Sequence, residues 1–231
     1  MKYSVSILAH NNLALTRNCL TSIFAAGCRK DEAELLLTDN GSQDGTWAYF
    51  ETLCAHHSHV RCFHNEHNLG FIKPNIAALQ EAKGEFFVLL NNDCLVPRDW
   101  LETMAEPFAD PLVMLTGPSG NSSSLGNDFR GYRGPYLEYI EGSCLMGRTA
   151  FLKEFGLFDD RLIGAYGEDA DLCLRVRQAG YKLASVPVNV RHLGGMTSAM
   201  VPEAAGWMQQ NLSYLRNKWS PYLVTREFND A

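Results

Sequence analysis

Short apolar runs that alternate with helical patterns restrict the fold of this chain more than any other feature. Each run is apolar almost throughout, and the segment after it has the 3.6-residue period of a helix. Such strands are typical of a parallel sheet that helices cover on both faces. The expected strands are residues 3–9, 34–38, 60–63 and 85–90, and the expected helices are residues 13–26, 44–55, 74–82 and 100–108.

The second half of the chain has a weaker pattern. We expect strands at 112–116, 137–146 and 182–190, the last interrupted by Pro187, and helices at 149–155, 169–178 and 204–219. Residues 118–135 are rich in Gly, Ser, Asn and Arg and have no apolar period, which is typical of a functional or mobile loop. No repeat or linker divides the sequence, so we predict one domain over residues 1–231.

Composition excludes several classes of protein. Of 231 residues, 46% are hydrophobic, and 20 Lys and Arg against 26 Asp and Glu give a net charge of −6. This balance is that of a globular protein rather than a disordered one. An acidic chain is a poor non-specific ligand for nucleic acid, so no nucleic-acid partner is expected. An anionic ligand is still possible where a metal or backbone N–H groups neutralise it.

Targeting signals and cysteine pairs are not evident. The first apolar stretch ends at His10, too early for a signal peptide, and no run is long enough to cross a bilayer. We therefore expect a cytoplasmic protein without a transmembrane segment, with peripheral attachment to a membrane left open. The seven cysteines include no CxxC pair, which favours small buried thiols in a reducing compartment over disulfides or zinc ligands.

Polar residues follow three of the expected strands, at residues 9–12, 39–42 and 91–93. Ligands of open α/β sheets bind at the carboxyl ends of strands, so three polar ends together indicate a binding site. Asp39 could accept a hydrogen bond from a base or sugar, and Asp93 could bind a divalent cation that a diphosphate also contacts. Turn chemistry is the alternative for both, because Asp and Asn favour turns.

A cluster of acids stands at the start of the expected helix at 169–178. It contains Glu168, Asp169 and Asp171. Acids at a helix start are favoured by the helix dipole and cap free N–H groups, which accounts for one or two of them. Another carboxylate could point into a cleft and act as a general base. Asp44 is interpreted as a helix-entry residue.

Further candidates are weaker when each is taken alone. The stretch from Asn68 through Gly70 to Lys73 offers a helix entry suited to anions and one cation. His192 is either a structural histidine or a contact for a metal or phosphate. Residues 196–200 follow two glycines and could fold over a site as a lid. Motifs of P-loop NTPases, dinucleotide-binding Rossmann proteins and serine hydrolases are absent from the sequence.

Taken in order, these motifs resemble the family two glycosyltransferases, and more narrowly their rhamnosyltransferase-like branch. The resemblance extends from about residue 3 to about residue 195. The segments that carry it are residues 5–8, 38–46, 65–70, 89–93 and 167–175.

The resemblance implies a GT-A fold, an α/β fold with a mostly parallel central sheet and helices on both faces. It also implies inverting transfer from a UDP- or dTDP-sugar donor with Mn²⁺ or Mg²⁺. The half at about 1–117 would bind the nucleotide, and the half at about 118–231 would bind a glycan, lipid-linked or protein acceptor. The sugar, the acceptor, the linkage and the oligomeric state are not specified by the sequence.

The family's functional positions map onto particular residues of this chain. Asp39 matches the carboxylate that reads the base, and the segment of Ala9, His10 and Asn11 matches the strand end that lines the nucleoside. Asn91 and Asn92 match the part of the DxD-type motif that faces the ribose and diphosphate, while Asp93 matches its metal ligand. Asp169 matches the catalytic base, with Glu168 beside it, and His192 matches a late histidine that helps hold the metal or diphosphate.

Two departures from the family pattern stand out. Residues 9–12 read Ala-His-Asn-Asn where the family usually has Pro-x-Tyr/Phe-Asn, and Asn91 replaces the first Asp of the DxD motif. The metal would then depend on Asp93. Two rival readings stay open: a non-catalytic sugar-nucleotide-binding subunit, and a nucleotidyltransferase.

Overall fold

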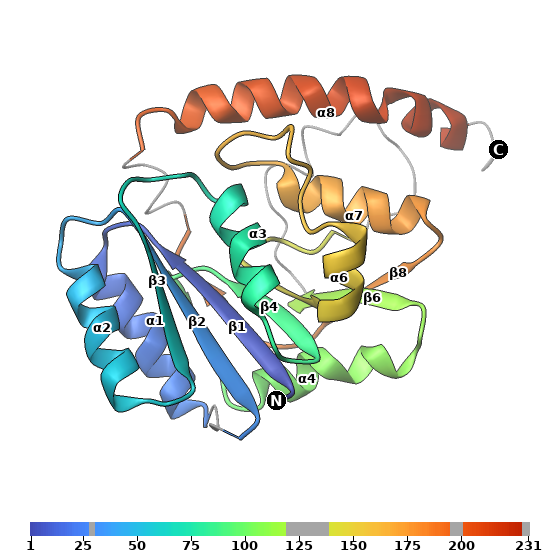
Figure 1. The fold of residues 1–231 in the computed structure, drawn as a ribbon. Helices are drawn as coiled ribbons and strands as arrows, with labels where there is room; N and C mark the ends of the chain where they lie inside the picture. Colours follow the sequence, from blue (N-terminus) through green and yellow to red (C-terminus); the bar gives the residue numbers. More distant parts are fainter. Residues whose placement is uncertain (28–30, 119–138, 195–200, 228–231) are drawn as a thin grey trace.

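The computed structural model describes residues 1–27, 31–118, 139–194 and 201–227. Seven strands of this part form one sheet in the order β3-β2-β1-β4-β7-β6-β8 (Figure 1). These strands are β1 (Tyr3–Ala9), β2 (Ala33–Asn40), β3 (Val60–Asn65), β4 (Phe86–Leu90), β6 (Val113–Pro118), β7 (Cys144–Arg148) and β8 (Lys182–Val186). The helices are α1 (Leu13–Ala25), α2 (Thr46–His56), α3 (Ile72–Glu81), α4 (Trp100–Ala105), α6 (Thr149–Phe155), α7 (Glu168–Gln178) and α8 (Ala204–Glu227).

The sheet is mostly parallel, as expected. Strands β3, β2, β1 and β4 pair in parallel, and so do β6 and β8. Strand β7 runs antiparallel to both of its neighbours and joins the two parallel groups. A separate two-stranded ribbon pairs β5 (Cys94–Leu95) with β9 (Arg191–His192).

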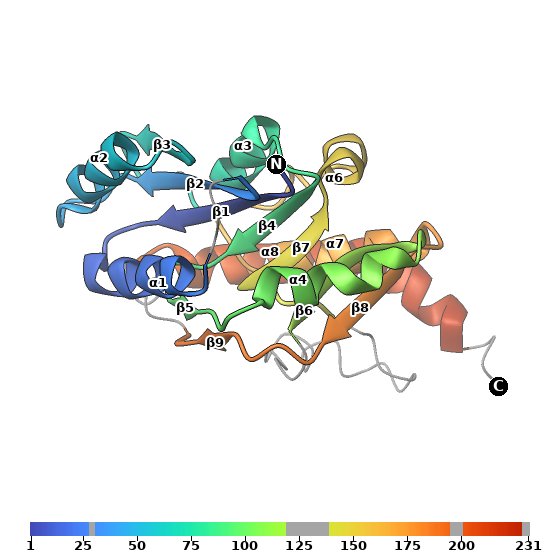
Figure 2. The ribbon, with the colours of Figure 1, turned by 90° about the horizontal axis from the view of Figure 1, so that it is seen from below.

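Two apolar layers lie on opposite faces of the sheet. Alternate residues of one strand separate them, since Val88 belongs to one layer and Leu89 to the other. One layer packs α1, α2 and α4 against the strands, and the other packs α3, α6, α7 and α8. Figure 2 shows α1 and α4 on one side of the strands and α3 and α6 on the other. Helices on both faces therefore bury strands that are apolar throughout.

The expected elements exist, with three corrections. The run expected as a strand at 137–146 becomes a strand only from Cys144, and the described residues before it form a loop. The run at 182–190 divides into β8 and β9, because the chain leaves the sheet at Pro187. The C-terminal helix continues past residue 219 to Glu227. No helix among the described residues is long and apolar enough to span a bilayer.

The cysteine prediction is right for four residues and wrong for two. Cys19, Cys94, Cys144 and Cys173 are buried free thiols. Cys54 and Cys62 form a disulfide, because the turn from α2 into β3 brings their Cα atoms to 6.4 Å, within the usual range for such a bond. A spacing of eight residues has no signature in the sequence. Cys28 lies outside the described residues.

Candidate functional site

A cleft of about 590 Å³ opens at the carboxyl ends of β1, β2 and β4. Strand ends, the entry to α3, the loop before β7, the start of α7 and the first turns of α8 all line it. The fold thus places a site where the sequence predicted one. The cleft brings together the expected residues His10, Asn68, Gly70, Asn91, Asn92, Asp93, Glu168, Asp169 and His192.

The remaining expected residues lie outside the lining of the cleft. Ala9 and Asp39 are fully buried, and Lys73 is exposed on α3. Asp39 accepts hydrogen bonds from the backbone N–H of Ser42 at 3.3 Å and contacts Nδ1 of His64 at 3.0 Å. Asn11 accepts a hydrogen bond from the backbone N–H of Gln43. Turn chemistry therefore accounts for the backbone contacts of Asp39 and Asn11 in this structure.

Asn40, at the end of β2, holds the loop that borders the cleft. Its amide donates to Oδ1 of Asn68 at 2.8 Å and to the carbonyl of Gly70 at 2.9 Å. Its side-chain oxygen accepts from Asn65 and from the backbone of Leu69. Our sequence reasoning assigned no role to Asn40, although it stands beside Asp39 in the same motif. The side-chain amide of Asn40 therefore fixes the positions of Asn68 and Gly70.

The end of β1 turns sharply before it reaches α1. Asn11 and Asn12 have φ angles of 55° and 57°, a left-handed conformation that Asn adopts more readily than most residues. His10 lines the cleft, and its Nδ1 lies 2.9 Å from the carbonyl of Asn40. This turn explains why the chain has Asn-Asn here. Asp44 has the helix-entry role that we expected, since it accepts from the backbone of Leu13 and Thr46.

Asp93 directly precedes β5 and meets His192 at the end of the β5–β9 ribbon, whose register places Cys94 opposite His192. Oδ1 of Asp93 lies 3.2 Å from Nε2 of His192 in an ion pair. It is buried and has no well-aligned hydrogen-bond partner. Asn91 also reaches this histidine, with its amide nitrogen 3.4 Å from Nε2. The amide nitrogen of Asn92 instead donates to Oγ1 of Thr16 on α1, at 2.9 Å.

A carboxylate oxygen is a donor that suits Mn²⁺ or Mg²⁺, and an imidazole nitrogen is a donor that suits transition-metal cations. The Asp93 carboxylate and then Glu141 raise the pKa of His192 to about 9. Oε1 of Glu141 lies 3.4 Å from Nδ1 of His192, the far side of the ring from Asp93. Metal-binding histidines commonly have such a carboxylate on their second nitrogen, which fixes the ring. The residues present therefore fit a divalent cation that displaces the proton between Asp93 and Nε2 of His192.

Cys94 lies within the same group of potential ligand atoms. Burial raises the pKa of its thiol far above the usual value, and the neighbouring Cys144 raises it further. Its Sγ donates to the carbonyl of Ser143. Hard cations such as Mn²⁺ and Mg²⁺ disfavour thiol ligands, so the candidate cation site consists of Asp93 and His192 without Cys94.

Asp169 is held by three donors at the start of α7. Oδ2 accepts from the hydroxyl of Tyr139 and, at 2.9 Å, from the backbone N–H of Gly142. Oδ1 accepts from the backbone of Ala170. Burial raises the pKa of Asp169, while these hydrogen bonds act to lower it. The loop before β7 thus orients this carboxylate.

Glu168 has a different environment from its neighbour. Its Oε2 is buried without a hydrogen-bond partner. Burial, and next the charge of Asp169, raise the pKa of Glu168 to about 8. Two such carboxyl groups titrate together, and the better hydrogen-bonded one ionises first. Burial thus favours the neutral form of Glu168, whereas the three hydrogen bonds favour the ionised form of Asp169 against the same burial.

Asp171 is structural, although it stands in the same acidic cluster. It is fully buried and binds Nζ of Lys218 at 2.6 Å, Nε1 of Trp219 at 2.9 Å and Nε of Arg175 at 2.8 Å. Two of these partners belong to α8. The carboxylate of Asp171 therefore attaches α8 to α7.

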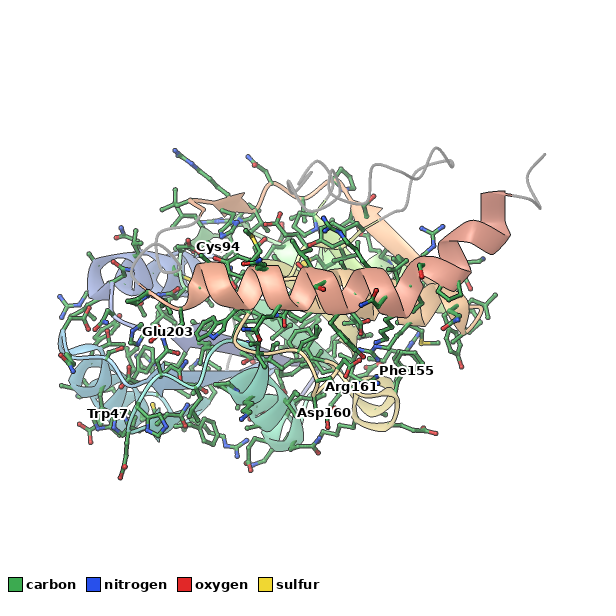
Figure 3. All side chains as sticks on the ribbon, turned by 90° about the horizontal axis from the view of Figure 1, so that it is seen from above. Trp47, Cys94, Phe155, Asp160, Arg161 and Glu203 are labelled. Carbon is green, nitrogen blue, oxygen red and sulfur yellow. A yellow bond between two sulfur atoms is a disulfide. The ribbon has the colours of Figure 1, made fainter. Side chains whose placement is uncertain are left out.

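Helix α8 contributes a wall of the cleft that the sequence did not predict. Figure 1 shows this helix running above α7, and Figure 3 shows it crossing the molecule as seen from above. Trp207 and Met208 line the cleft from its first turns. The loop residues Tyr139 and Glu141 were missed as well, because they precede β7 in a run that we interpreted as a strand. None of these missed residues directly follows an apolar run, which is the signal that pointed to His192.

Two segments expected near the site fall outside the described residues. The lid candidate at 196–200 is one of them, and nearly all of the loop candidate at 118–135 is the other. Both stay predictions.

Comparison with known proteins identifies the family. The model of glycosyl transferase family 2 matches residues 4–155, more than half of the chain. The chain therefore belongs to glycosyl transferase family 2, a family of glycosyltransferase enzymes. Asp93 lies inside the matched segment, whereas Asp169 and His192 follow it.

Relatives and solved structures agree with this assignment. The pre-mycofactocin glycosyltransferase of Mycobacterium tuberculosis is 25% identical over 203 residues, which cover 80% of this chain and 41% of that protein. The chain thus spans less than half the length of that relative. An uncharacterized glycosyltransferase of Bacillus subtilis, YfnE, is 23% identical over 95% of this chain and 71% of its own length.

Two solved structures show the fold. The mannosyltransferase PcManGT of Pyrobaculum calidifontis, in complex with GDP-Man and Mn²⁺, has a TM-score of 0.66 and 21% identity over 80% of this chain and 55% of its own. GalNAc-T7, with UDP, GalNAc and Mn²⁺, has a TM-score of 0.69 and 22% identity over 83% of this chain and 43% of its own. The predicted GT-A fold is confirmed.

Proposed function

We propose that this chain is an inverting, metal-dependent glycosyltransferase. It moves a sugar from a UDP- or dTDP-sugar to a hydroxyl group of a glycan, lipid-linked or protein acceptor. One observation carries the proposal: a single cleft holds the Asp93–His192 pair, suited to a cation, and the separate carboxylate of Asp169. Asn91 in place of the first Asp of the DxD motif favours the rhamnosyltransferase-like branch.

Asp93 and His192 would hold Mn²⁺ or Mg²⁺. When bound, such a cation neutralises the charge that develops on a departing diphosphate. Asn91, beside His192, is placed to donate hydrogen bonds to the same diphosphate. Because Asn91 carries no charge, Asp93 supplies the only formal negative charge of this motif.

Asp169 is the general base in this proposal. The hydroxyl of Tyr139 and the N–H of Gly142 keep one of its oxygens fixed, and Oδ1 accepts from Ala170 near the cleft. Its ionised carboxylate removes the proton of the acceptor hydroxyl as that oxygen attacks the anomeric carbon. Glu168, which holds a proton near neutral pH, does not compete for this role.

Asp39 reads the base of the nucleotide in this proposal, with the segment of Ala9, His10 and Asn11 beside it. Because His64 contacts Asp39 at 3.0 Å, donor binding requires this histidine to release one carboxylate oxygen. The His64 side chain is 38% exposed, so it has room to move. Lys73 stays a proposed phosphate contact that would reach the ligand from outside the cleft.

A thermal-shift experiment tests donor and metal binding. The purified chain is heated with UDP, dTDP, GDP or CMP, each with Mn²⁺, with Mg²⁺ or with EDTA. At about 100 times its dissociation constant, a ligand adds about 2.7 kcal/mol, which raises Tm by roughly 5–10 °C for a domain of this size. We expect such a shift with UDP or dTDP, and we expect EDTA to remove it.

Two variants make the test specific. Asp93→Asn should lose the metal-dependent part of the shift, because the amide lacks the charge that holds the cation. Asp160→Asn changes an exposed acid of the loop before α7 and should behave as wild type. Equal shifts with and without metal in the wild type would contradict the metal role. No shift with any nucleotide would favour a non-catalytic protein.

A further inference from the structure

We propose that Trp207 forms a subsite for a pyranose ring of the acceptor. The inference rests on the proposed function and adds to it a residue that selects the acceptor. It also adds a ligand class, a glycoside whose ring packs on an indole. The indole of Trp207 is half-buried and lines the cleft together with Asp169.

Close glycine contacts fix the position of Trp207. A Cβ atom built on Gly164 would lie 2.0 Å from the indole ring, so the ring lies directly against the backbone of this glycine. Gly164 in turn packs against Gly70, where an added Cβ would lie 2.6 Å from the Cα of Gly164. Three segments that are distant in sequence are thus in direct contact through Gly70, Gly164 and the ring of Trp207. The indole consequently stands at a fixed place at the border of the cleft.

The same loop joins Trp207 to the proposed base. Gly164 and Asp169 are five residues apart, and between them Tyr166 also lines the cleft. Tyr166 has a φ of 79°, a strained conformation for a residue with a side chain. The amide of Asn211 on α8 binds its carbonyl at 3.0 Å and helps to hold it there. Trp207, Tyr166 and Asp169 are therefore part of the wall that α7, α8 and the loop before α7 contribute to the cleft.

The direction of the reaction assigns this wall to the acceptor. In an inverting displacement, the acceptor oxygen attacks from the face opposite the departing diphosphate. The diphosphate belongs with Asp93 and His192 at the end of the β5–β9 ribbon. Asp169 must contact the attacking hydroxyl, so the acceptor ring lies on the side of α7 and α8. Trp207 and Tyr166 are the aromatic side chains that these elements and their adjoining loop add to the described lining.

The chemistry of the wall suits a sugar ring. The C–H groups of a pyranose carry partial positive charge and pack on the negative face of an indole. Pockets of this kind combine apolar or aromatic walls with a few polar groups that fix orientation. Here Asp169 is the polar group and would bind the reacting hydroxyl. Met208, which follows Trp207 and is 40% exposed, adds apolar surface to the lining of the cleft.

Saturation-transfer NMR tests this subsite directly. The probes are methyl glycopyranosides of common hexoses and 6-deoxyhexoses, titrated into the chain with UDP and Mg²⁺ while the aromatic protons are irradiated. At least one probe should show transfer to its ring protons. Trp207→Ala should reduce this signal and the apparent affinity about tenfold, whereas Trp207→Phe, which keeps an aromatic face, should lose about threefold.

A matched control and a donor readout separate this inference from the proposed function. Tyr181→Ala removes a half-buried aromatic ring that follows the far end of α7 and is not part of the described lining. It should leave the glycoside signal unchanged. The thermal shift with nucleotide and metal should be retained in both Trp207 variants. Its absence from the wild type would contradict the proposed function rather than the subsite.

Two outcomes would overturn the subsite. One is a wild-type chain that shows no transfer to the ring protons of any probe. The other is a Trp207→Ala variant that keeps the wild-type glycoside affinity. Circular dichroism and the nucleotide shift verify that Trp207→Ala is folded, and Trp207→Phe provides the comparison if it is not.

Discussion

At the scale of single residues, one helical turn holds three acids with three different roles. Glu168 is buried without a partner for one oxygen, Asp169 accepts three hydrogen bonds, and Asp171 is bound by cations and an indole. The environment therefore favours the neutral form of the first, hydrogen bonds favour the ionised form of the second, and the third is structural. Their environments, rather than their residue type, distinguish them.

Asp169→Asn should abolish transfer while it preserves nucleotide binding. The amide cannot take a proton from the acceptor, and removing a general base costs roughly 10²–10⁴-fold in rate. The rate of transfer from the donor, measured next to the UDP-induced thermal shift, checks both parts. Asp160→Asn, an exposed acid of the preceding loop, is the control. Turnover within a few fold of wild type would mean that another residue is the base.

Tyr139→Phe should change the pH dependence of the reaction. Burial raises the pKa of Asp169, and the hydroxyl of Tyr139 is the first of the groups that lower it. Removing that hydroxyl raises the pKa, so a higher pH is needed to ionise the base. The acidic limb of kcat/KM against pH should therefore move to higher pH. A profile that superimposes on that of the wild type would show that Tyr139 does not tune this carboxylate.

At the scale of elements, one side chain couples α8 to the loop that carries the site. Asn211 is 2% exposed, and its amide makes four hydrogen bonds to the backbone of residues 163–166. These bonds complement the close packing of Gly167, where an added Cβ would lie 2.5 Å from Leu215. The shape of the loop before α7 thus depends on a helix that comes some 40 residues later.

Asn211→Ala should weaken both stability and catalysis. The substitution leaves buried carbonyl groups without donors, which costs about 2–4 kcal/mol of unfolding free energy. The loop would also hold Tyr166 and Asp169 less firmly, so kcat should fall more than donor affinity. Urea unfolding and steady-state kinetics measure the two effects. The control is Gln210→Ala, an exposed neighbour, and an Asn211→Ala variant that matched it would contradict the coupling.

At the scale of the whole molecule, Lys218 joins three parts of the second layer. Its Nζ lies 2.7 Å from Asp159, which follows α6, and 2.6 Å from Asp171 on α7. Burial disfavours ionisation of Asp159, but hydrogen bonds from Arg161, Lys218 and Tyr214 outweigh it and hold its pKa well below the usual range. A depressed pKa in the folded state stabilises the protein above the unfolded pKa near 4. That contribution is lost as the pH falls further.

Lys218→Met should therefore destabilise the protein most at neutral pH. Removing one partner of a largely buried ion pair costs about 3 kcal/mol. The difference from wild type should shrink between pH 7 and pH 3, because Asp159 of the variant has lost a cation that lowers its pKa and takes up a proton at a higher pH than Asp159 of the wild type. Urea unfolding at both pH values measures it. Lys182→Met breaks an exposed pair with Asp110 and should have little effect. A difference that does not depend on pH would contradict the role of Asp159.

The sequence by itself determined the layered α/β fold and the positions of its first four parallel strands. Their signals are local: apolar runs with a helical period between them, and polar residues where the strands stop. For the same reason the sequence pointed to Asp93, Glu168 and Asp169, which line the cleft, since each stands next to the end of a regular element. Asn91 and His192 were found in this way too.

Only the tertiary structure decided which other side chains meet these residues. Tyr139 and Glu141 come from a loop with no period, and Trp207 and Asn211 come from a helix distant in sequence. Packing at Gly164 and Gly167 sets where that helix lies. The disulfide of Cys54 and Cys62 likewise depends on how α2 turns into β3. Contacts between distant segments leave no periodic mark in a sequence, because each depends on how both segments pack.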